Sequence, residues 1–161
     1  MPNYASQFTD PGGNGSVAYP SESGAVVSNR YTFQLGRNGI PASLLVNDII
    51  DLGLLPAGCT VEDVIIDTDD LDTNGTPTIS LDVGIMTGTP GDVVSARTCG
   101  QEFFAGDQTA RTGGVTRMTR SQGFRVAPSG ADRSIGVRVA AAAATWATGN
   151  PTFTLQVRIR G

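Results

Sequence analysis

The feature that most constrains this chain is a strict alternation of apolar and polar residues, repeated at four places. Successive side chains of a β-strand point to opposite faces of a sheet, so each repeat predicts a strand with one buried face. The strictly alternating segments are 31–35, 79–85, 135–139 and 153–159. Less regular strand candidates lie at 44–52, 60–67, 94–104 and 115–126.

Turn-forming residues separate these segments. The turn signals are Asn38-Gly39, Pro56-Ala57-Gly58, Asn74-Gly75, Pro90-Gly91-Asp92 and Gly149-Asn150-Pro151. The 161 residues include 21 Gly and 9 Pro but only 3 Glu and no Lys, a composition poor in strong helix formers. The run from Ala140 to Ala144 favours helix but is too short to nucleate one, so we expect it to continue the preceding strand. About eight strands with no alternating helices predict an all-β, single-domain β-sandwich, a jelly roll of antiparallel strands, over residues 29–161.

Residues 1–28 differ from the rest of the chain. They are rich in Gly, Ser, Pro and Asn, with isolated Tyr4, Phe8, Val17 and Tyr19. This composition cannot build its own core, so it predicts an extended N-terminal arm or a disordered tail. The interspersed aromatic residues favour an arm that packs on something, and Tyr4, Phe8 and Tyr19 are its candidate interface residues.

The residue types that are missing exclude most catalytic chemistry. Without His or Lys the chain has no histidine base, imidazole ligand or Schiff-base lysine, so we expect neither an enzyme nor a cofactor. No apolar run reaches 18 residues, and we expect no membrane partner. The N-terminus lacks the basic start and apolar stretch of a secretory signal, which favours reduced Cys59 and Cys99.

The strongest local motif is acidic. Asp70, Asp72 and Asn74, followed by Gly75, fit the beginning of a calcium loop. The twelfth position is Leu81 where a bidentate Glu is required, and strands rather than helices flank the motif. The alternative is an acidic strand connection in which Asn74-Gly75 supplies the positive φ angles, and this alternative is favoured over a metal site.

The charges are divided between the two halves of the chain. Residues 1–96 carry ten Asp, two Glu and two Arg, whereas residues 97–161 carry two Asp, one Glu and nine Arg. Either the halves interleave in one sheet system and the charges pair, or the molecule is bipolar and docks a basic face on an acidic partner. The sequence leaves both open. Four arginines, which are Arg111, Arg117, Arg120 and Arg125, are candidate interface residues; an isoelectric point near 4.6 argues against nucleic acid as the partner.

Residues 48–85 carry a resemblance. The stretch DIIDLGLLPAG at 48–58, the acidic turn at 67–72 and GTPTISLDVG at 75–84 resemble small structural proteins of tailed bacteriophages. This resemblance implies a capsid decoration (cement) protein with a jelly-roll or sandwich fold, and it carries over no catalytic residue.

The function expected from this resemblance is decoration of a tailed-phage capsid on its exterior, after assembly in the cytoplasm of the bacterial host. The expected partners are the major capsid protein and sister copies in a homo-oligomer, a dimer or a trimer. The alternative is a receptor- or carbohydrate-binding module of a tail fibre or spike, for which Trp146 is the one good exposed aromatic candidate.

Overall fold

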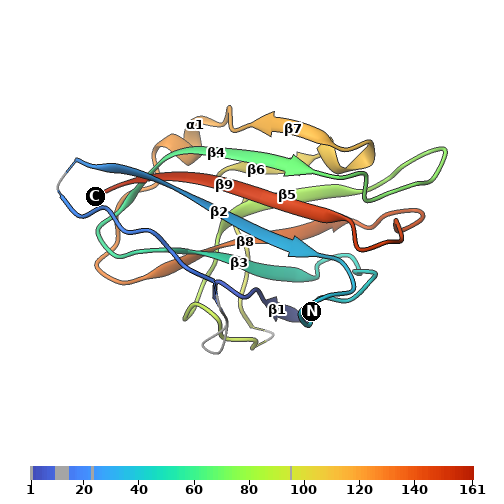
Figure 1. Ribbon diagram of the computed structural model, residues 1–161, viewed down its shortest axis with the longest axis horizontal. Helices are drawn as coiled ribbons and strands as arrows, with labels where there is room; N and C mark the ends of the chain where they lie inside the picture. Colours follow the sequence, from blue (N-terminus) through green and yellow to red (C-terminus); the bar gives the residue numbers. More distant parts are fainter. Residues whose placement is uncertain (1, 10–14, 23, 95) are drawn as a thin grey trace.

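The computed structural model describes residues 2–9, 15–22, 24–94 and 96–161, and its strands form two facing sheets (Figure 1). One sheet has the order β1 (Asn3–Ala5), β3 (Ile49–Leu55), β8 (Arg133–Ala141), β5 (Ser80–Ile85) and β6 (Phe104–Asp107). The other has the order β2 (Val26–Gln34), β9 (Thr152–Arg160), β4 (Thr60–Thr68) and β7 (Gly114–Arg117). A 3-10 turn, η1 (Thr109–Arg111), precedes β7, and a single-turn helix, α1 (Ser121–Phe124), follows it. The predicted all-β sandwich is confirmed.

The strand pairs identify the sandwich as a jelly roll. β2 pairs with β9, β3 with β8, β4 with β7 and β5 with β6, all antiparallel. The first four of these strands therefore run alongside the last four, as in one long hairpin. Further pairs, β4 with β9 and β5 with β8, fold this hairpin over itself into two sheets. This is the eight-stranded jelly-roll arrangement, with β1 added at one edge as a parallel strand.

Two of the less regular strand candidates were largely wrong. In the segment 94–104 only Phe104 belongs to a strand, and residue 95 lies outside the described residues. The segment 115–126 is divided between β7 and α1. The apolar residues in these segments make separate contacts with the sandwich instead of lining one continuous face of a sheet. Their spacing therefore lacks the two-residue period of a strand. β8 also ends at Ala141, part of the way into the alanine run.

The turn signals were mostly correct. Positive φ angles occur at Asn38-Gly39, Gly58, Gly91 and Gly149-Asn150. Asn74-Gly75 is the exception, since neither residue has a positive φ. This acidic connection is shaped by side-chain hydrogen bonds instead, as described below.

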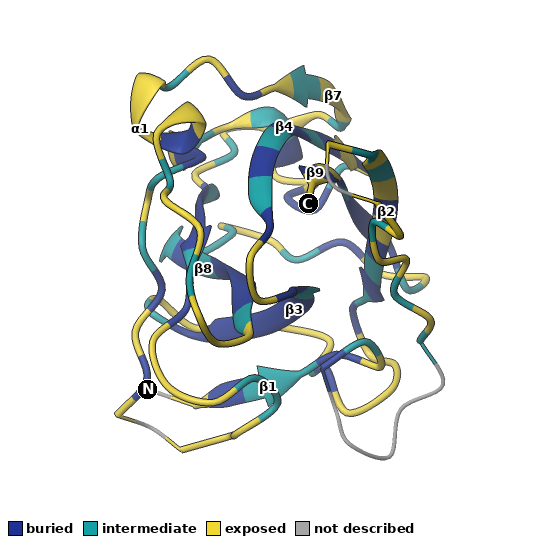
Figure 2. Ribbon diagram, turned by 90° about the vertical axis from the view of Figure 1, so that its left-hand side faces the viewer, coloured by how far each residue is buried: buried dark blue, intermediate teal, exposed yellow. Residues whose placement is uncertain are grey.

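The core lies between the two sheets, whose inner faces are buried (Figure 2). Phe33 of β2 and Phe153 of β9 stack with their ring centroids 5.1 Å apart. Tyr31 fills the space over Gly53, where a Cβ atom would lie 2.2 Å from the Tyr31 ring. A glycine in β3 is therefore what allows a tyrosine to enter the core, and the Tyr31 hydroxyl donates a hydrogen bond to the Leu54 carbonyl at 2.6 Å.

The outer face of the five-stranded sheet is covered by the connection between β5 and β6, of which residues 86–94 and 96–103 are described. Beneath it, Ile49, Met86 and Cys99 form a small second apolar cluster. Arg97 is 2% exposed and pairs through Nη1 with the buried Asp51 of β3, while its Nη2 donates to Ser134 Oγ at 2.9 Å. This buried ion pair holds the covering segment on the sheet. Both cysteines of the chain are buried free thiols.

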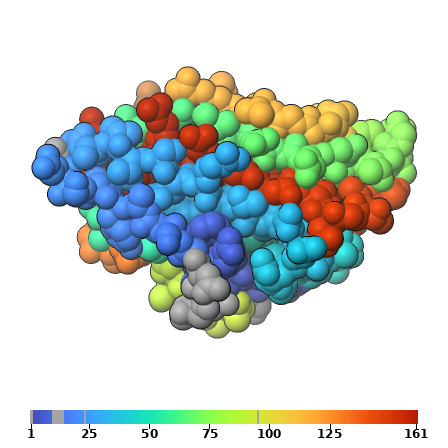
Figure 3. All heavy atoms as spheres, in the orientation of Figure 1, coloured from blue at the N-terminus to red at the C-terminus, as the bar shows by residue number. Residues whose placement is uncertain are grey.

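The described parts of the N-terminal arm pack on the chain's own sandwich. Residues 2–9 and 15–22 run along the side where β2 and β3 face each other, and Figure 3 shows the arm in blue on the surface there. The Thr9 hydroxyl donates to the Asp51 carbonyl at 2.7 Å, and the Asn29 side chain brackets the backbone of Ala18 with two hydrogen bonds. Residues 1, 10–14 and 23 of the expected arm lie outside the described residues, and β2 begins at Val26, inside the range assigned to the arm.

Four connections gather at one end of the sandwich, on the right in Figure 1: residues 35–48, 69–79, 108–113 and 142–151. Each of them joins a strand of one sheet to a strand of the other, because every second connection of the jelly-roll hairpin lies at this end. Within the described part of the chain, no helix is long and apolar enough to span a membrane.

Candidate binding surfaces

The acidic motif is organised around one buried carboxylate. Asp72 is 1% exposed, and its two oxygens accept short hydrogen bonds from four backbone N–H groups, besides a longer one of 3.4 Å from the Asn74 N–H. The donors are Thr78 at 2.7 Å, Ile79 at 3.1 Å, Ala144 at 3.0 Å and Thr145 at 2.9 Å. Two of these donors belong to the connection 69–79 and its strand, and two to 142–151. Asp72 therefore ties together two loops that are some 70 residues apart in the sequence.

These hydrogen bonds determine the ionisation of Asp72. Burial by itself would raise the pKa of this carboxyl group, but the four backbone hydrogen bonds stabilise the charged form and lower the pKa to about 2. Asp72 is thus ionised at neutral pH, and the dipoles of the peptide N–H groups stabilise its negative charge.

The other two calcium candidates have a similar local role. Asp70 Oδ1 accepts from the Asp72 N–H at 2.9 Å, and Asn74 Oδ1 accepts from the Thr76 N–H at 2.9 Å. The residues are neighbours, as the sequence requires, but their side chains are used to shape the backbone. Among the residues that the structure describes, no group of three or more Asp, Glu, Cys or His is placed to hold a metal ion. The connection is explained without an ion.

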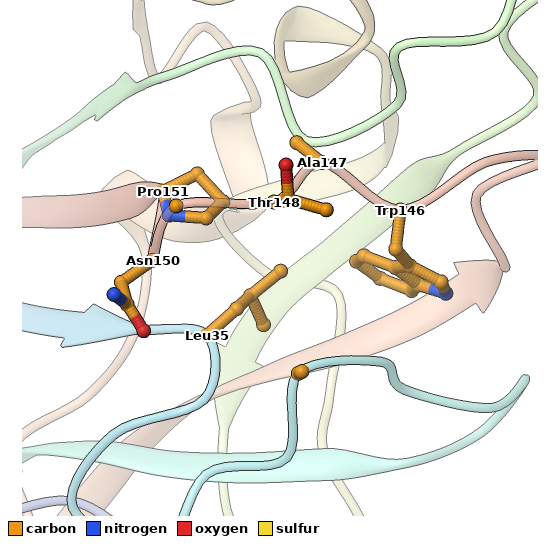
Figure 4. A pocket seen from close by; sticks show the side chains of 8 residues that line it. Leu35, Trp146, Ala147, Thr148, Asn150 and Pro151 are labelled. Carbon is orange, nitrogen blue, oxygen red and sulfur yellow. The ribbon is translucent and has the colours of Figure 1, made fainter.

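A pocket of about 340 Å³ lies beside this connection, at the same end of the sandwich. Figure 4 shows the Trp146 indole at one side, Asn150 at the other, and Leu35 between them. Asp72 forms an isolated β-bridge with Trp146, and the Ala147 N–H donates to the Leu71 carbonyl at 3.1 Å. The acidic motif therefore positions the tryptophan that the sequence singles out. The lining residues are Leu35, Ala42, Trp146, Ala147, Thr148, Gly149, Asn150 and Pro151.

The four candidate arginines do not form one cluster. Arg111 lies in η1, where it donates to the Ile79 carbonyl at 2.9 Å, at the opposite end of β7 from the other three. Arg117 pairs with Asp63 at 2.9 Å, which raises the pKa of its guanidinium, and Arg120 donates to the Gln122 side chain. Arg117, Arg120 and Arg125 all lie on the segment that contains β7 and α1.

The same segment exposes two apolar side chains that sequence reasoning did not select. Val115 in β7 is 69% exposed and Phe124 in α1 is 52% exposed. In Figure 2 β7 and α1 form the largely exposed top of the molecule. Neither residue belongs to a periodic pattern, so no sequence signal separates it from a core residue.

Acidic groups of the first half of the chain form ion pairs with arginines of the second half. Four of the five ion pairs in the described residues join an acid of the first half to an arginine of the second half. The hairpin topology places strands of the two halves side by side, so the division of charge follows from the fold. The interleaved alternative is thus supported for these groups. The four pairs are Asp51–Arg97, Asp63–Arg117, Asp82–Arg138 and Glu62–Arg160, and the fifth is Arg30–Asp67.

The aromatic residues of the arm take different positions. Phe8 packs edge-on against Tyr31, with ring centroids 5.2 Å apart, and this contact attaches the arm to the core. Tyr4 is partly buried in β1, where burial and then the charge of Asp48 raise the pKa of its phenol. Tyr19 is 55% exposed. Of the three, Tyr19 is the most accessible to a partner.

A second hollow, of about 400 Å³, lies along the open edge of β1. It is lined by the three residues of β1 and by parts of two connections, among them Asn38, Gly39, Gly91 and Val93. Val93 is 59% exposed and Val94 is 49% exposed, while the Val94 carbonyl accepts a hydrogen bond from the Asn3 side chain. A terminal strand of a sheet next to exposed apolar side chains is suited to a protein contact.

Comparison with solved structures gives two informative matches. A chain of the capsid of Ralstonia phage GP4 is 37% identical; the match covers 99% of this chain and 98% of that chain, with a TM-score of 0.87. A chain of the cyanophage Pam1 capsid asymmetric unit is 23% identical over 91% of this chain and 94% of that chain, with a TM-score of 0.62. No family profile and no curated protein matches the sequence. The Pam1 likeness shows a common fold, and the GP4 likeness extends along almost the whole chain.

Proposed function

This chain belongs to the same family as the protein of the Ralstonia phage GP4 capsid, and from that premise we propose that it decorates and stabilises the shell of a tailed phage. In this role it is a structural, non-enzymatic virion protein on the capsid exterior that bridges subunits of the major capsid protein. The observation that carries the proposal is the 37% identity over 99% of the chain. The match to a capsid favours this role over the tail-fibre or spike alternative.

The outer face of the four-stranded sheet supports an exterior position. Its polar side chains bond to one another across strands, so they have little need for a protein partner. Such a face is stable in water, and we assign it to the solvent side. The contacts are Thr32–Thr154 at 3.2 Å, Gln34–Thr152 at 3.2 Å, Ser28–Gln156 at 3.0 Å and Arg30–Asp67 at 3.4 Å.

The edge of β1 is the surface that we assign to the capsid. It combines the terminal strand of the five-stranded sheet, the hollow of about 400 Å³ and the exposed side chains of Val93 and Val94. An extended segment of a capsid subunit can add to a free strand edge through backbone hydrogen bonds. The exposed Tyr19 would extend this contact along the arm. The arginines near α1 lie at the opposite side of the molecule from β1 (Figure 1), where they would form a separate contact with an acidic neighbour or a sister copy in a dimer or trimer.

Many copies acting together make modest contacts sufficient. A decorating homo-oligomer engages several subunits at once, so the second contact forms at a high effective concentration. The rigid sandwich keeps the contacting surfaces at fixed distances from one another. Shell stability then rises without any single tight interface.

A capsid occupancy assay tests the assignment. Shells without the decorating protein are mixed with wild-type chain or with Val93→Asp, and the bound protein is measured after sedimentation. Ser28→Asp, on the polar face, adds the same charge at the other side of the molecule and serves as the matched control. We expect Val93→Asp to lose at least about tenfold in affinity, as for a charge placed in an apolar contact, while Ser28→Asp binds like wild type. Equal binding by both variants would overturn the assigned surface, and failure of wild-type chain to bind shells would overturn the decoration role.

A further inference from the structure

The pocket beside Trp146 has a chemistry that shell attachment does not use. Its lining is mainly apolar, from Leu35, Ala42, Trp146 and Pro151. The hydroxyl of Thr148 and the carboxamide of Asn150 supply polar groups at the rim. None of the eight lining residues carries an ionisable side chain, so the pocket has no group that would select a charged ligand.

The polar groups at the rim are available to a ligand. Within the described part of the chain, the side chains of Thr148 and Asn150 form no hydrogen bond. Asn150 has a φ of 58° and follows Gly149 with a φ of 85°, so two successive left-handed residues set the direction of the carboxamide. Figure 4 shows this carboxamide across the pocket from the indole, with Leu35 between them.

The pocket is also preformed. The Asp72 carboxylate fixes the backbone of Ala144 and Thr145, directly before Trp146. At the opposite wall, the Leu35 N–H donates to the Pro151 carbonyl at 3.2 Å. Because both walls are held by hydrogen bonds, a ligand does not have to order the site, which favours affinity even for a small molecule.

We infer that this pocket binds one ring of a neutral carbohydrate. A pyranose has apolar C–H faces that pack on an aromatic ring, and hydroxyl groups at its edge that need both donors and acceptors. The carboxamide of Asn150 offers both, and the Thr148 hydroxyl offers both. A volume of about 340 Å³ lies at the lower end of the range for ligand pockets, which suits one or two rings rather than a long chain. A virion with such sites would adhere weakly, through many copies, to glycan-coated surfaces.

The only tryptophan of the chain provides the measurement, because it lies in the pocket. Glucose, galactose, mannose and N-acetylglucosamine are titrated separately into the full chain while Trp146 fluorescence is recorded. Glycerol, which has hydroxyl groups but no ring, is the control for solvent effects. We expect a saturable change with at least one sugar at millimolar dissociation constants, and a linear, small response to glycerol.

Two variants connect binding to the pocket. Asn150→Gly removes the carboxamide but keeps a residue that accepts a positive φ, and we expect affinity to fall about three- to tenfold, as for the loss of one or two neutral hydrogen bonds. Ala42→Phe fills the pocket from an exposed position and should abolish binding. Thermal unfolding verifies that both variants are folded.

Two results would overturn the inference. One is the absence of a saturable response to all four sugars up to about 100 mM, well above millimolar affinity. The other is a response that Ala42→Phe leaves unchanged in a folded protein. Neither result bears on shell attachment, which the Val93 and Ser28 variants measure separately.

Discussion

Replacing Asp72 by Asn is the sharpest test of how the loop end of the jelly roll is held. The variant keeps the shape of the side chain but removes its charge, and it turns one acceptor oxygen into a donor. Three N–H groups, from Thr78, Ile79 and Ala144, donate to Asp72 Oδ2. The fourth short bond, from the Thr145 N–H, goes to Oδ1, which also accepts the longer bond of 3.4 Å from the Asn74 N–H. If the remaining oxygen takes the position of Oδ2, three bonds change from charge-assisted to neutral and the fourth is lost.

The magnitude follows from these four bonds. A hydrogen bond to a charged group contributes about 1.5–3 kcal/mol and a neutral one about 1 kcal/mol. Three bonds that each lose about 0.5–2 kcal/mol and one that loses about 1.5–3 kcal/mol should together lower the free energy of unfolding by about 3–9 kcal/mol, a large part of the ~5–15 kcal/mol that stabilises an ordinary domain. For a chain of this length even the lower end corresponds to a fall in Tm of about 6–12 °C.

Thermal and urea unfolding of wild type, Asp72→Asn and Asp67→Asn measure the effect. Asp67 is exposed and pairs with Arg30 at 3.4 Å, so its variant should lose less than about 1 kcal/mol. A Tm of Asp72→Asn within about 2 °C of that of Asp67→Asn would refute the reasoning, since ~1 kcal/mol already shifts Tm by about 2–4 °C.

The dependence on pH gives an independent check. Folding lowers the pKa of Asp72 from its ordinary value of 3.8 to about 2, so its contribution is fully present above pH 3.8 and is lost as the pH falls toward 2. The stability difference between wild type and Asp72→Asn should be constant between about pH 5 and 8 and should narrow below pH 3.8. A difference that does not change down to pH 2 would contradict the assignment of the lowered pKa.

Three further results are expected. Arg97→Ala leaves the buried Asp51 carboxylate without its partner and should lower the free energy of unfolding in urea by about 3–5 kcal/mol. The exposed Arg30→Ala should lower it by less than about 1 kcal/mol. Similar losses for the two variants would argue that Arg97 does not hold the covering segment on the sheet. Gly84→Ala puts a Cβ 2.3 Å from the backbone of that covering segment, so it should destabilise by about 1–3 kcal/mol or more, and a neutral effect would show that the segment shifts easily. Burial raises the pKa of the Cys99 thiol to about 12 and also raises that of Cys59, so neither should react with a thiol reagent at pH 8 in the folded chain, and rapid native-state labelling would contradict this.

The sequence was most informative for strands in which one face is buried and the other is exposed to solvent. The alternation at 153–159 predicts β9 almost to its ends, because the inner residues meet the core and the outer ones meet water. In β3 this signal is weaker, since Ile49 and Asp51 lie under residues 86–103 and the strand is buried on both faces. The covering segment itself has no period, because its apolar residues serve separate contacts.

The candidate site was less predictable than the fold. The acidic motif marks a real structural centre, but the same pattern of Asp and Asn residues is compatible with a calcium loop and with a carboxylate that accepts hydrogen bonds from backbone N–H groups. Only the position of 142–151 beside 69–79, a consequence of the jelly-roll pairing, separates them. Exposed Val115 and Phe124 were missed for a related reason, since exposure of an apolar residue depends on neighbours from distant segments.

The long hairpin that builds the jelly roll also bears on how the chain reaches its fold. Val26 pairs with Arg160, so the first long strand has no partner until the last one has left the ribosome. Topologies in which such distant segments must meet fold slowly, because closing the loop costs entropy before any contact repays it. Here the two halves of the chain that contain these strands, residues 1–96 and 97–161, carry opposite net charge, ten negative against six positive. Their mutual attraction offsets part of that closure entropy, and the rate of refolding should therefore fall as salt screens the two halves from each other.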